Sequence, residues 1–97
     1  MYTGDMRLRE LEKVYKALGA RKRLEILKLL ADGKELAVGD IAAAIHLSFK
    51  STSKHLVLLR QVGFLERRQF GFAGLYSLED RLPTLLQQLI KQIRQAG

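Results

Sequence analysis

Apolar side chains recur every three or four positions over five stretches of the chain, the spacing that lines one face of an α-helix. The first stretch predicts a helix over 5–18, and the second predicts a helix over about 21–32 whose apolar positions nearly encircle it. A short helix over 38–45 and a longer one over 49–62 follow. The last stretch predicts a helix over 81–96 with one narrow apolar arc.

Between the fourth and the last helix, the pattern changes from helical spacing to the alternation of a β-hairpin. Residues 65–69 and 75–78 read as strands, and the glycines in 70–74 indicate a turn between them. The two middle helices are joined by a connection short enough for a helix-turn-helix unit. The predicted fold is therefore mainly α with a small β-hairpin: a winged helix-turn-helix of about five helices plus a two-stranded wing, forming a single domain over 1–97.

The helix over 49–62 has one apolar side and one polar side. Ser48 is a good N-cap for it, because a serine oxygen accepts a hydrogen bond from a free N–H of the first turn. Lysines and short hydroxyls on its outer side are the groups that donate to bases and phosphates in the major groove of DNA. The alternative interpretation is an ordinary solvated helix face. The residues predicted to face outward are Phe49, Lys50, Ser53, Lys54 and Val57, with Ser51 at the margin.

The chain has 17 Lys and Arg against 10 Asp and Glu, and a net charge of +7 favours anionic partners such as nucleic acid. The excess is concentrated in residues 48–78, which hold five basic side chains and one acidic one. Arg67 and Arg68 of the hairpin are expected to contact phosphates beside the groove; alternatively, they only keep a strand edge soluble. Phe70 and Phe72 are expected to pack back on the core, the alternative being an apolar surface for a partner.

The residues needed for catalysis, redox chemistry or metal binding are few. The chain has no cysteine, which excludes disulfides and thiolate sites. It has no glycine-rich phosphate loop and no convincing Ser/His/Asp set, so an enzyme and a cofactor are not expected. A zinc site needs three or four ligands, whereas His46 is interpreted as a turn residue and His55 as a packing or phosphate-contacting residue.

No apolar run approaches the roughly 18 residues that span a bilayer, and no signal-peptide pattern opens the chain. A cytoplasmic protein with no membrane partner is expected.

Three segments, in their order and spacing, are similar to the ArsR-type winged-helix repressors: Leu18–Leu30, Leu47–Leu56 and Leu59–Leu65. The resemblance covers nearly the whole chain, from the first helix to the last. It implies a dimer whose first and last helices form the interface. It also implies that DNA is recognised by the outward residues of the fourth helix, here Phe49, Lys50, Ser53 and Lys54.

The sequence departs from the family pattern at two places. Phe49 and Lys50 replace the small polar residues usual there, so the operator sequence cannot be carried over from relatives. Many ArsR-type proteins sense metals through a Cys-Val-Cys element entering the third helix, but Ala37 and Gly39 stand at those positions here. After Asp80 the chain has no His, Asp or Glu of the kind that other relatives use in the last helix. No metal site is therefore predicted.

The apolar stripes of the first and last helices are expected to be buried against a second copy of the chain. A small domain gains stability when a two-fold dimer covers both stripes. The alternative is that the last helix folds over its own subunit. The interface residues predicted in this way are Leu8, Leu11, Tyr15, Leu82, Leu85, Leu86, Leu89 and Ile93.

These features predict a sequence-specific double-stranded DNA-binding transcriptional regulator, a repressor. Its homodimer would read an inverted repeat with helix 49–62 and wing 65–78. The alternatives are a winged-helix protein-interaction adaptor, a non-specific DNA-packaging protein and, least favoured, a membrane-surface role for the last helix. The sequence leaves open whether a small-molecule effector exists. The predicted DNA-binding residues are Ser48, Phe49, Lys50, Ser51, Ser53, Lys54, Arg67 and Arg68.

Overall fold

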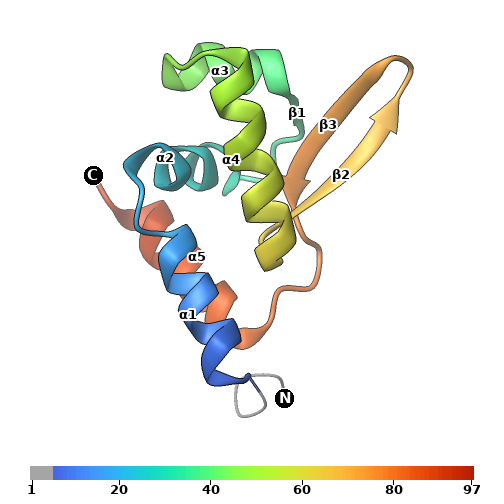
Figure 1. Ribbon diagram of the computed structural model, residues 1–97. Coiled ribbons are helices and arrows are strands. Elements are labelled where there is room, and N and C mark those ends of the chain that lie inside the picture. Colours follow the sequence, from blue (N-terminus) through green and yellow to red (C-terminus); the bar gives the residue numbers. More distant parts are fainter. Residues whose placement is uncertain (1–5) are drawn as a thin grey trace.

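A computed structural model describes residues 6–97 of the chain and contains the five predicted helices and the hairpin (Figure 1). Asp5, the first residue of the predicted 5–18 helix, lies outside the described residues. The last helix starts later than predicted, because Pro83 has an extended backbone and is its N-cap. The elements are α1 (Leu8–Ala17), α2 (Arg21–Leu30), β1 (Leu36–Ala37), α3 (Val38–Ile45), α4 (Phe49–Val62), β2 (Leu65–Phe70), β3 (Ala73–Leu78) and α5 (Thr84–Gln95).

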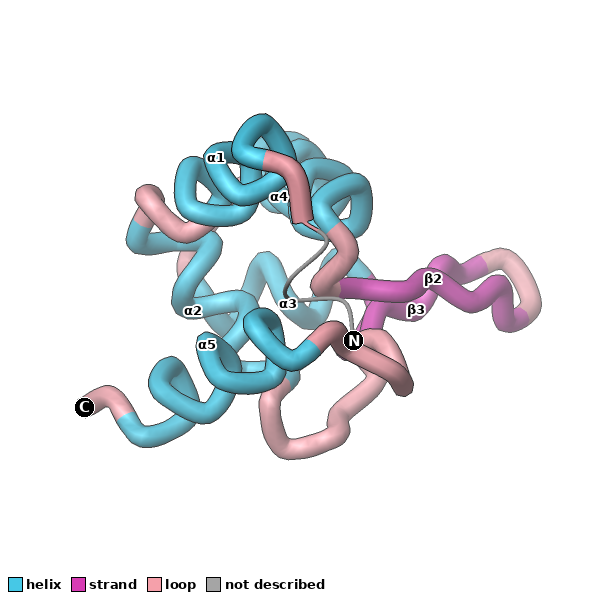
Figure 2. The backbone as a smooth tube through the Cα atoms, turned by 90° about the horizontal axis from the view of Figure 1, so that it is seen from below, coloured by secondary structure: helices cyan, strands magenta, loops and turns pink. Residues whose placement is uncertain are grey.

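Helix α2 is the centre of the core, as its apolar pattern predicted. Ile26, Leu27 and Leu30 are fully buried, and α2 contacts α3, α4, α5 and β3. Burial of each such side chain contributes roughly 1.5–3 kcal/mol to stability. Helix α1 packs on α4 and α5 packs on α2, so that Figure 2 shows α1 and α5 at opposite sides of the view.

The basic residues of α2 hold the carboxyl ends of three other helices. Arg23 Nε donates to the carbonyl of Ala17 at the end of α1, over 2.6 Å. Lys22 Nζ donates to the carbonyl of Ile45 at the end of α3, also over 2.6 Å, and Lys28 donates to carbonyls at the end of α5. The last carbonyls of a helix lack partners within it and carry partial negative charge, so cations stabilise them.

The turn between α3 and α4 is closed by a left-handed residue and a serine cap. His46 has φ 56° and ψ 52°, and the N–H of Leu47 donates to the carbonyl of Ala42 over 3.0 Å. This is a Schellman-type ending, in which glycine is the usual left-handed residue. The Ser48 Oγ then accepts from the N–H of Ser51, which confirms both the turn role of His46 and the N-cap role of Ser48.

The wing belongs to a three-stranded antiparallel sheet with the order β1-β3-β2. The added strand, β1, has two residues, Leu36 and Ala37, which pair with Tyr76 and Leu75 of β3. The predicted five-residue turn was wrong: Phe70 pairs with Ala73, and only two residues connect the strands. Gly71 at φ 62° supplies the left-handed conformation that such a tight turn needs.

Leu86 is a correction to the predicted dimer interface. Its side chain is 2% exposed and belongs to the core of its own subunit, with its Cδ2 close to Gly63 at the end of α4. One edge of helix α5 thus packs on its own subunit. The alternative interpretation, in which the last helix folds over its own subunit, holds for this edge only. Ile90 is buried as well, whereas the remaining residues of the apolar arc are only half-buried: Leu82, Leu85, Leu89 and Ile93.

Helix α1 presents a more exposed apolar surface. Leu8 is 83% exposed and Tyr15 is 52% exposed, while Leu11 is half-buried. Helices α1 and α5 both lie at the end of the molecule away from α3 (Figure 1). The predicted interface residues other than Leu86 therefore retain surface on which a partner can pack.

Candidate nucleic-acid interface

Helix α4 has the two faces predicted from its sequence. Thr52, Leu56 and Leu59 are fully buried against the subunit. The opposite face is open, with Phe49 63% exposed and Val57 46% exposed. A large aromatic side chain left in water on the first turn of a helix gains nothing for the fold.

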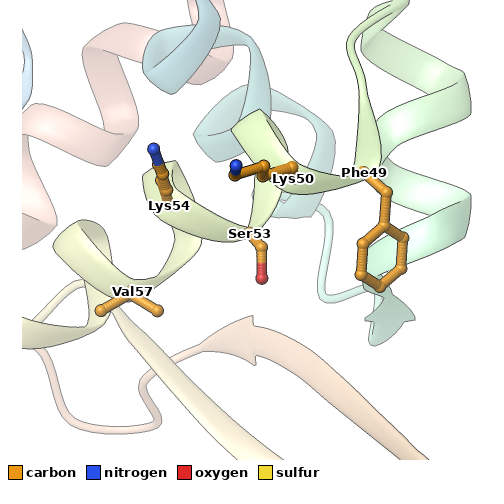
Figure 3. Close-up of a pocket in the computed structure, with 5 residues that line it drawn as sticks. All are labelled: Phe49, Lys50, Ser53, Lys54 and Val57. Carbon is orange, nitrogen blue, oxygen red and sulfur yellow. The ribbon is translucent and has the colours of Figure 1, made fainter.

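The outward side chains of α4 together line a shallow hollow. Figure 3 shows five side chains projecting from successive turns of the helix, with both lysine amines and the Ser53 hydroxyl at its surface. None of the four ion pairs in residues 6–97 includes Lys50 or Lys54, so both charges are free for an external anion. The residues that line the hollow are Phe49, Lys50, Ser53, Lys54 and Val57.

Val57 is an addition to the predicted site. The sequence predicts that it faces outward, but its apolar side chain carries no donor or acceptor that marks it as a DNA-binding residue. In the hollow it lies beside Ser53 and Lys54, one turn further along the helix. An apolar side chain on a helix that enters the major groove can contact a thymine methyl group, and the position of Val57 is suited to such a contact.

The wing arginines differ in their surroundings. Arg68 forms two hydrogen bonds with the Glu35 carboxylate, at 3.0 Å from Nε and 2.7 Å from Nη2, and its guanidinium lies 5.4 Å from the centre of the Phe70 ring. Arg67 lies over Gly74 of the neighbouring strand, where a side chain would collide with it, and takes part in none of the ion pairs in the described chain. The sequence predicts the same phosphate contact for both arginines, whereas of the two only Arg67 has a charge that no carboxylate compensates.

The carboxylates around Arg68 affect one another. The hydrogen bond from Arg68 holds the pKa of Glu35 below its ordinary value. Burial raises the pKa of Glu66 on β2, and the neighbouring carboxylates of Asp80, Glu79 and Glu35 raise it further. Near Arg68 the sheet is therefore partly acidic, which weakens the attraction of that side chain for a phosphate.

The wing tip is apolar and exposed. Phe70 is 64% exposed and Phe72 is fully exposed, so the expectation that both pack back on the core was wrong. The hairpin projects from the helical body (Figures 1 and 2), which leaves its tip beyond the reach of the core.

His55 makes an internal contact. Its Nδ1 lies 3.2 Å from Arg23 Nη1, and because a guanidinium only donates, Nδ1 accepts and the ring proton is on Nε2. Burial, with a contribution from the Arg23 charge, lowers the pKa of His55 below its ordinary value of 6.5. A neutral, hydrogen-bonded ring supports the packing interpretation rather than a phosphate contact.

Over residues 6–97, no group of three or more His, Asp or Glu side chains is arranged to hold a metal ion. None of the helices in this part of the chain combines the length and the apolar character required to cross a bilayer.

A helix-turn-helix with an open polar face on its second helix, followed by a projecting β-hairpin, defines the winged helix-turn-helix class of DNA-binding proteins. The model of the family described as "Bacterial regulatory protein, arsR family" matches residues 21–67. The transcriptional activator HlyU of Vibrio cholerae is 30% identical over 95 residues, covering 91% of this chain and 87% of HlyU. The arsenical resistance operon repressor of Escherichia coli is 34% identical over 80 residues, covering 82% of this chain and 68% of the repressor.

This chain belongs to the ArsR family of transcriptional regulators. Solved structures agree with that assignment. HlyU from Vibrio cholerae superposes with a TM-score of 0.76 at 28% identity, covering 96% of this chain and 94% of HlyU. The homodimeric winged helix-turn-helix DNA-binding domain Mb0332 from Mycobacterium bovis gives a TM-score of 0.76 at 31% identity, covering 90% and 77% of the two chains.

Proposed function

We propose that this protein is a sequence-specific transcriptional repressor that binds an inverted repeat in double-stranded DNA as a homodimer. The observation that carries the proposal is the open face of α4, where unpaired lysines, a hydroxyl and two apolar side chains adjoin. In this arrangement Lys50 and Lys54 donate to guanine acceptors or to phosphate, and Ser53 contacts either. Phe49 and Val57 contact thymine methyl groups. Ser51 borders this face.

The positioning contacts come from the start of α4 and from the wing. Ser48 caps α4 with its oxygen, and the N-terminus of a helix favours a nearby phosphate. Arg67 supplies the free cation of the wing. Arg68, which the sequence placed beside it as a phosphate ligand, contributes less because Glu35 compensates its charge.

The dimer is proposed to form through α1 and α5. Leu8 and Tyr15 are exposed to an extent that the subunit alone does not explain, and the related domain Mb0332 is homodimeric. A two-fold axis between these helices would place two copies of α4 one helical turn of DNA apart, roughly 34–36 Å, so that the operator is an inverted repeat. The proposed contact residues are Leu8, Leu11, Tyr15, Leu82, Leu85, Leu89 and Ile93.

Repression is inferred because a bound dimer covers the DNA it recognises, and the Escherichia coli relative is named a repressor. HlyU is named an activator, so the direction of regulation needs its own measurement. In vitro transcription from a template carrying the selected operator should fall as protein is added; a rise would overturn the repressor assignment. A regulator of this kind acts on the chromosome, hence in the cytoplasm.

The experiment is selection of bound duplexes from a random library, followed by anisotropy titrations of the selected and a scrambled duplex. We expect a preference of about 10³-fold or more for the selected duplex. Lys50→Ala with Lys54→Ala should reduce that preference, whereas Lys91→Ala, an exposed lysine of α5, should not. Equal binding of both duplexes would indicate a packaging protein.

The exposed wing tip favours a second candidate function, docking of a protein partner through Phe70 and Phe72. In an adaptor of this kind DNA binding would be weak and indifferent to sequence. Failure to bind any duplex at moderate salt would favour it over the repressor.

A further inference from the structure

A second hollow lies between α1, α2 and α4, away from the proposed reading face. Its volume is about 400 Å³, which falls within the usual range of small-molecule sites. It does not share a residue with the hollow in front of Lys50 and Lys54. The residues that line it are Lys13, Lys16, Ala17, Arg23, Leu58, Gln61 and Val62.

Its charge is of one sign. Three cationic side chains line it, Lys13, Lys16 and Arg23, and no carboxylate does. None of the ion pairs found in residues 6–97 involves any of the three. Like charges that line one hollow repel one another, so a bound anion would relieve the repulsion as well as form new contacts.

Arg23 is fixed in place by the subunit. Its Nε donates to the Ala17 carbonyl, its Nη2 donates to the Lys16 carbonyl at 3.3 Å, and its Nη1 donates to His55. A guanidinium has five N–H groups, so one on each terminal nitrogen has no partner in the described residues. A guanidinium held in this way loses little rotational freedom on binding, and it matches the geometry of a carboxylate.

The remaining wall is apolar. Ala17 of α1 is buried, and Leu58 and Val62 of α4 are half-buried on the side that faces the hollow. Gln61 adds one amide to this wall. A ligand that fills the hollow therefore needs an apolar body as well as a negative charge.

We propose that this hollow binds a small organic anion, a carboxylate carried on an aromatic or branched apolar body. Arg23 and the two lysines hold the carboxylate, and Leu58 and Val62 pack on the body. The site does not depend on the proposed DNA-binding function. An inorganic anion or a DNA phosphate would use the cations but leave the apolar wall uncovered.

The test is a titration of the folded chain with benzoate, followed through the methyl resonances of Leu58 and Val62 by NMR. Benzamide, which has the same body without the charge, and acetate, which has the charge without the body, are the matched ligands. We expect benzoate to bind at least about tenfold more tightly than either, with shifts confined to this hollow. Equal binding of acetate and benzoate, or shifts elsewhere, would overturn the proposal.

Variants locate the charge requirement. Lys13→Gln with Lys16→Gln should weaken benzoate binding about tenfold, and both side chains are exposed, so the fold is retained. Lys91→Gln is the control for each single variant, Lys13→Gln and Lys16→Gln, because it removes one exposed lysine of α5 that does not line the hollow. If the double variant binds benzoate normally but loses DNA affinity, these lysines contact phosphate and the proposal fails.

Discussion

Removing the carboxylate of Glu35 should strengthen DNA binding, because it would release Arg68 for a phosphate. The two side chains are joined by two hydrogen bonds of 3.0 and 2.7 Å, and the carboxylate comes from the loop before β1. Arg68 is 55% exposed, so water and a DNA phosphate can both reach its guanidinium. Glu35→Gln keeps the shape of the side chain and removes its charge.

The expected effect follows from counterion release. Each phosphate that a protein neutralises adds about 0.9 to the magnitude of the slope of log K against log salt. One added contact in each subunit of the proposed dimer should therefore steepen the slope by about 1.8, and the gain in affinity should shrink about twelvefold between 50 and 200 mM salt. The assay is fluorescence anisotropy on the selected duplex over that salt range.

A matched control separates this local effect from net charge. Glu12→Gln on α1 raises the net charge by the same amount, but Glu12 is in none of the ion pairs of residues 6–97. Equal slopes for Glu35→Gln and Glu12→Gln would refute the reasoning. The reasoning would also be refuted if, in the chain that retains Glu35, Arg68→Ala reduced the salt slope as much as Arg67→Ala does.

Three further predictions concern the fold. His46→Gly should raise the free energy of unfolding by about 0.5–1 kcal/mol in urea titrations, because glycine adopts the left-handed conformation at φ 56° without strain; a decrease would contradict this. Stability should fall as the pH drops below 6.5, since the unfolded chain protonates His55 before the folded chain, whose pKa is lowered; in His55→Gln that decline should be smaller. Leu86→Ala should cost about 2–5 kcal/mol of subunit stability, because Leu86 is a core residue. Leu8→Glu should instead leave the subunit folded and shift sedimentation toward the monomer. A Leu86→Ala variant of unchanged stability, or a Leu8→Glu variant that remains a dimer, would contradict these separate roles in the core and in the interface.

The helices and the two faces of α4 could be predicted because they depend on local spacing. Apolar residues three and four apart must share a face, so Leu56 and Leu59 were placed inside and Lys50 and Lys54 outside. The N-cap at Ser48 was equally local, since it involves a backbone N–H three residues away.

Contacts between distant segments were outside the reach of such patterns. Glu35 and Arg68 are 33 residues apart, and only the pairing of β1 with β3 brings the loop before β1 close to β2. Strand β1 has two residues, too few to show an alternation. Leu86 was misassigned for a related reason: spacing shows that it shares a stripe with Leu85 and Leu89, but not which part of the stripe its own subunit covers.

The positive charge of the chain is divided between holding the fold and binding an anion. The α2 residues Lys22, Arg23 and Lys28 donate to the ends of other helices, and Arg68 is paired with a carboxylate. The proposed interface therefore rests on the two lysines of α4 and the one free arginine of the wing, fewer cations than a net charge of +7 suggests. About three phosphate-neutralising groups per subunit predict a salt slope near −3 per subunit. For the dimer this amounts to about −6, and a slope much steeper than that would mean that further cations, such as those beside the α1–α4 hollow, also contact DNA.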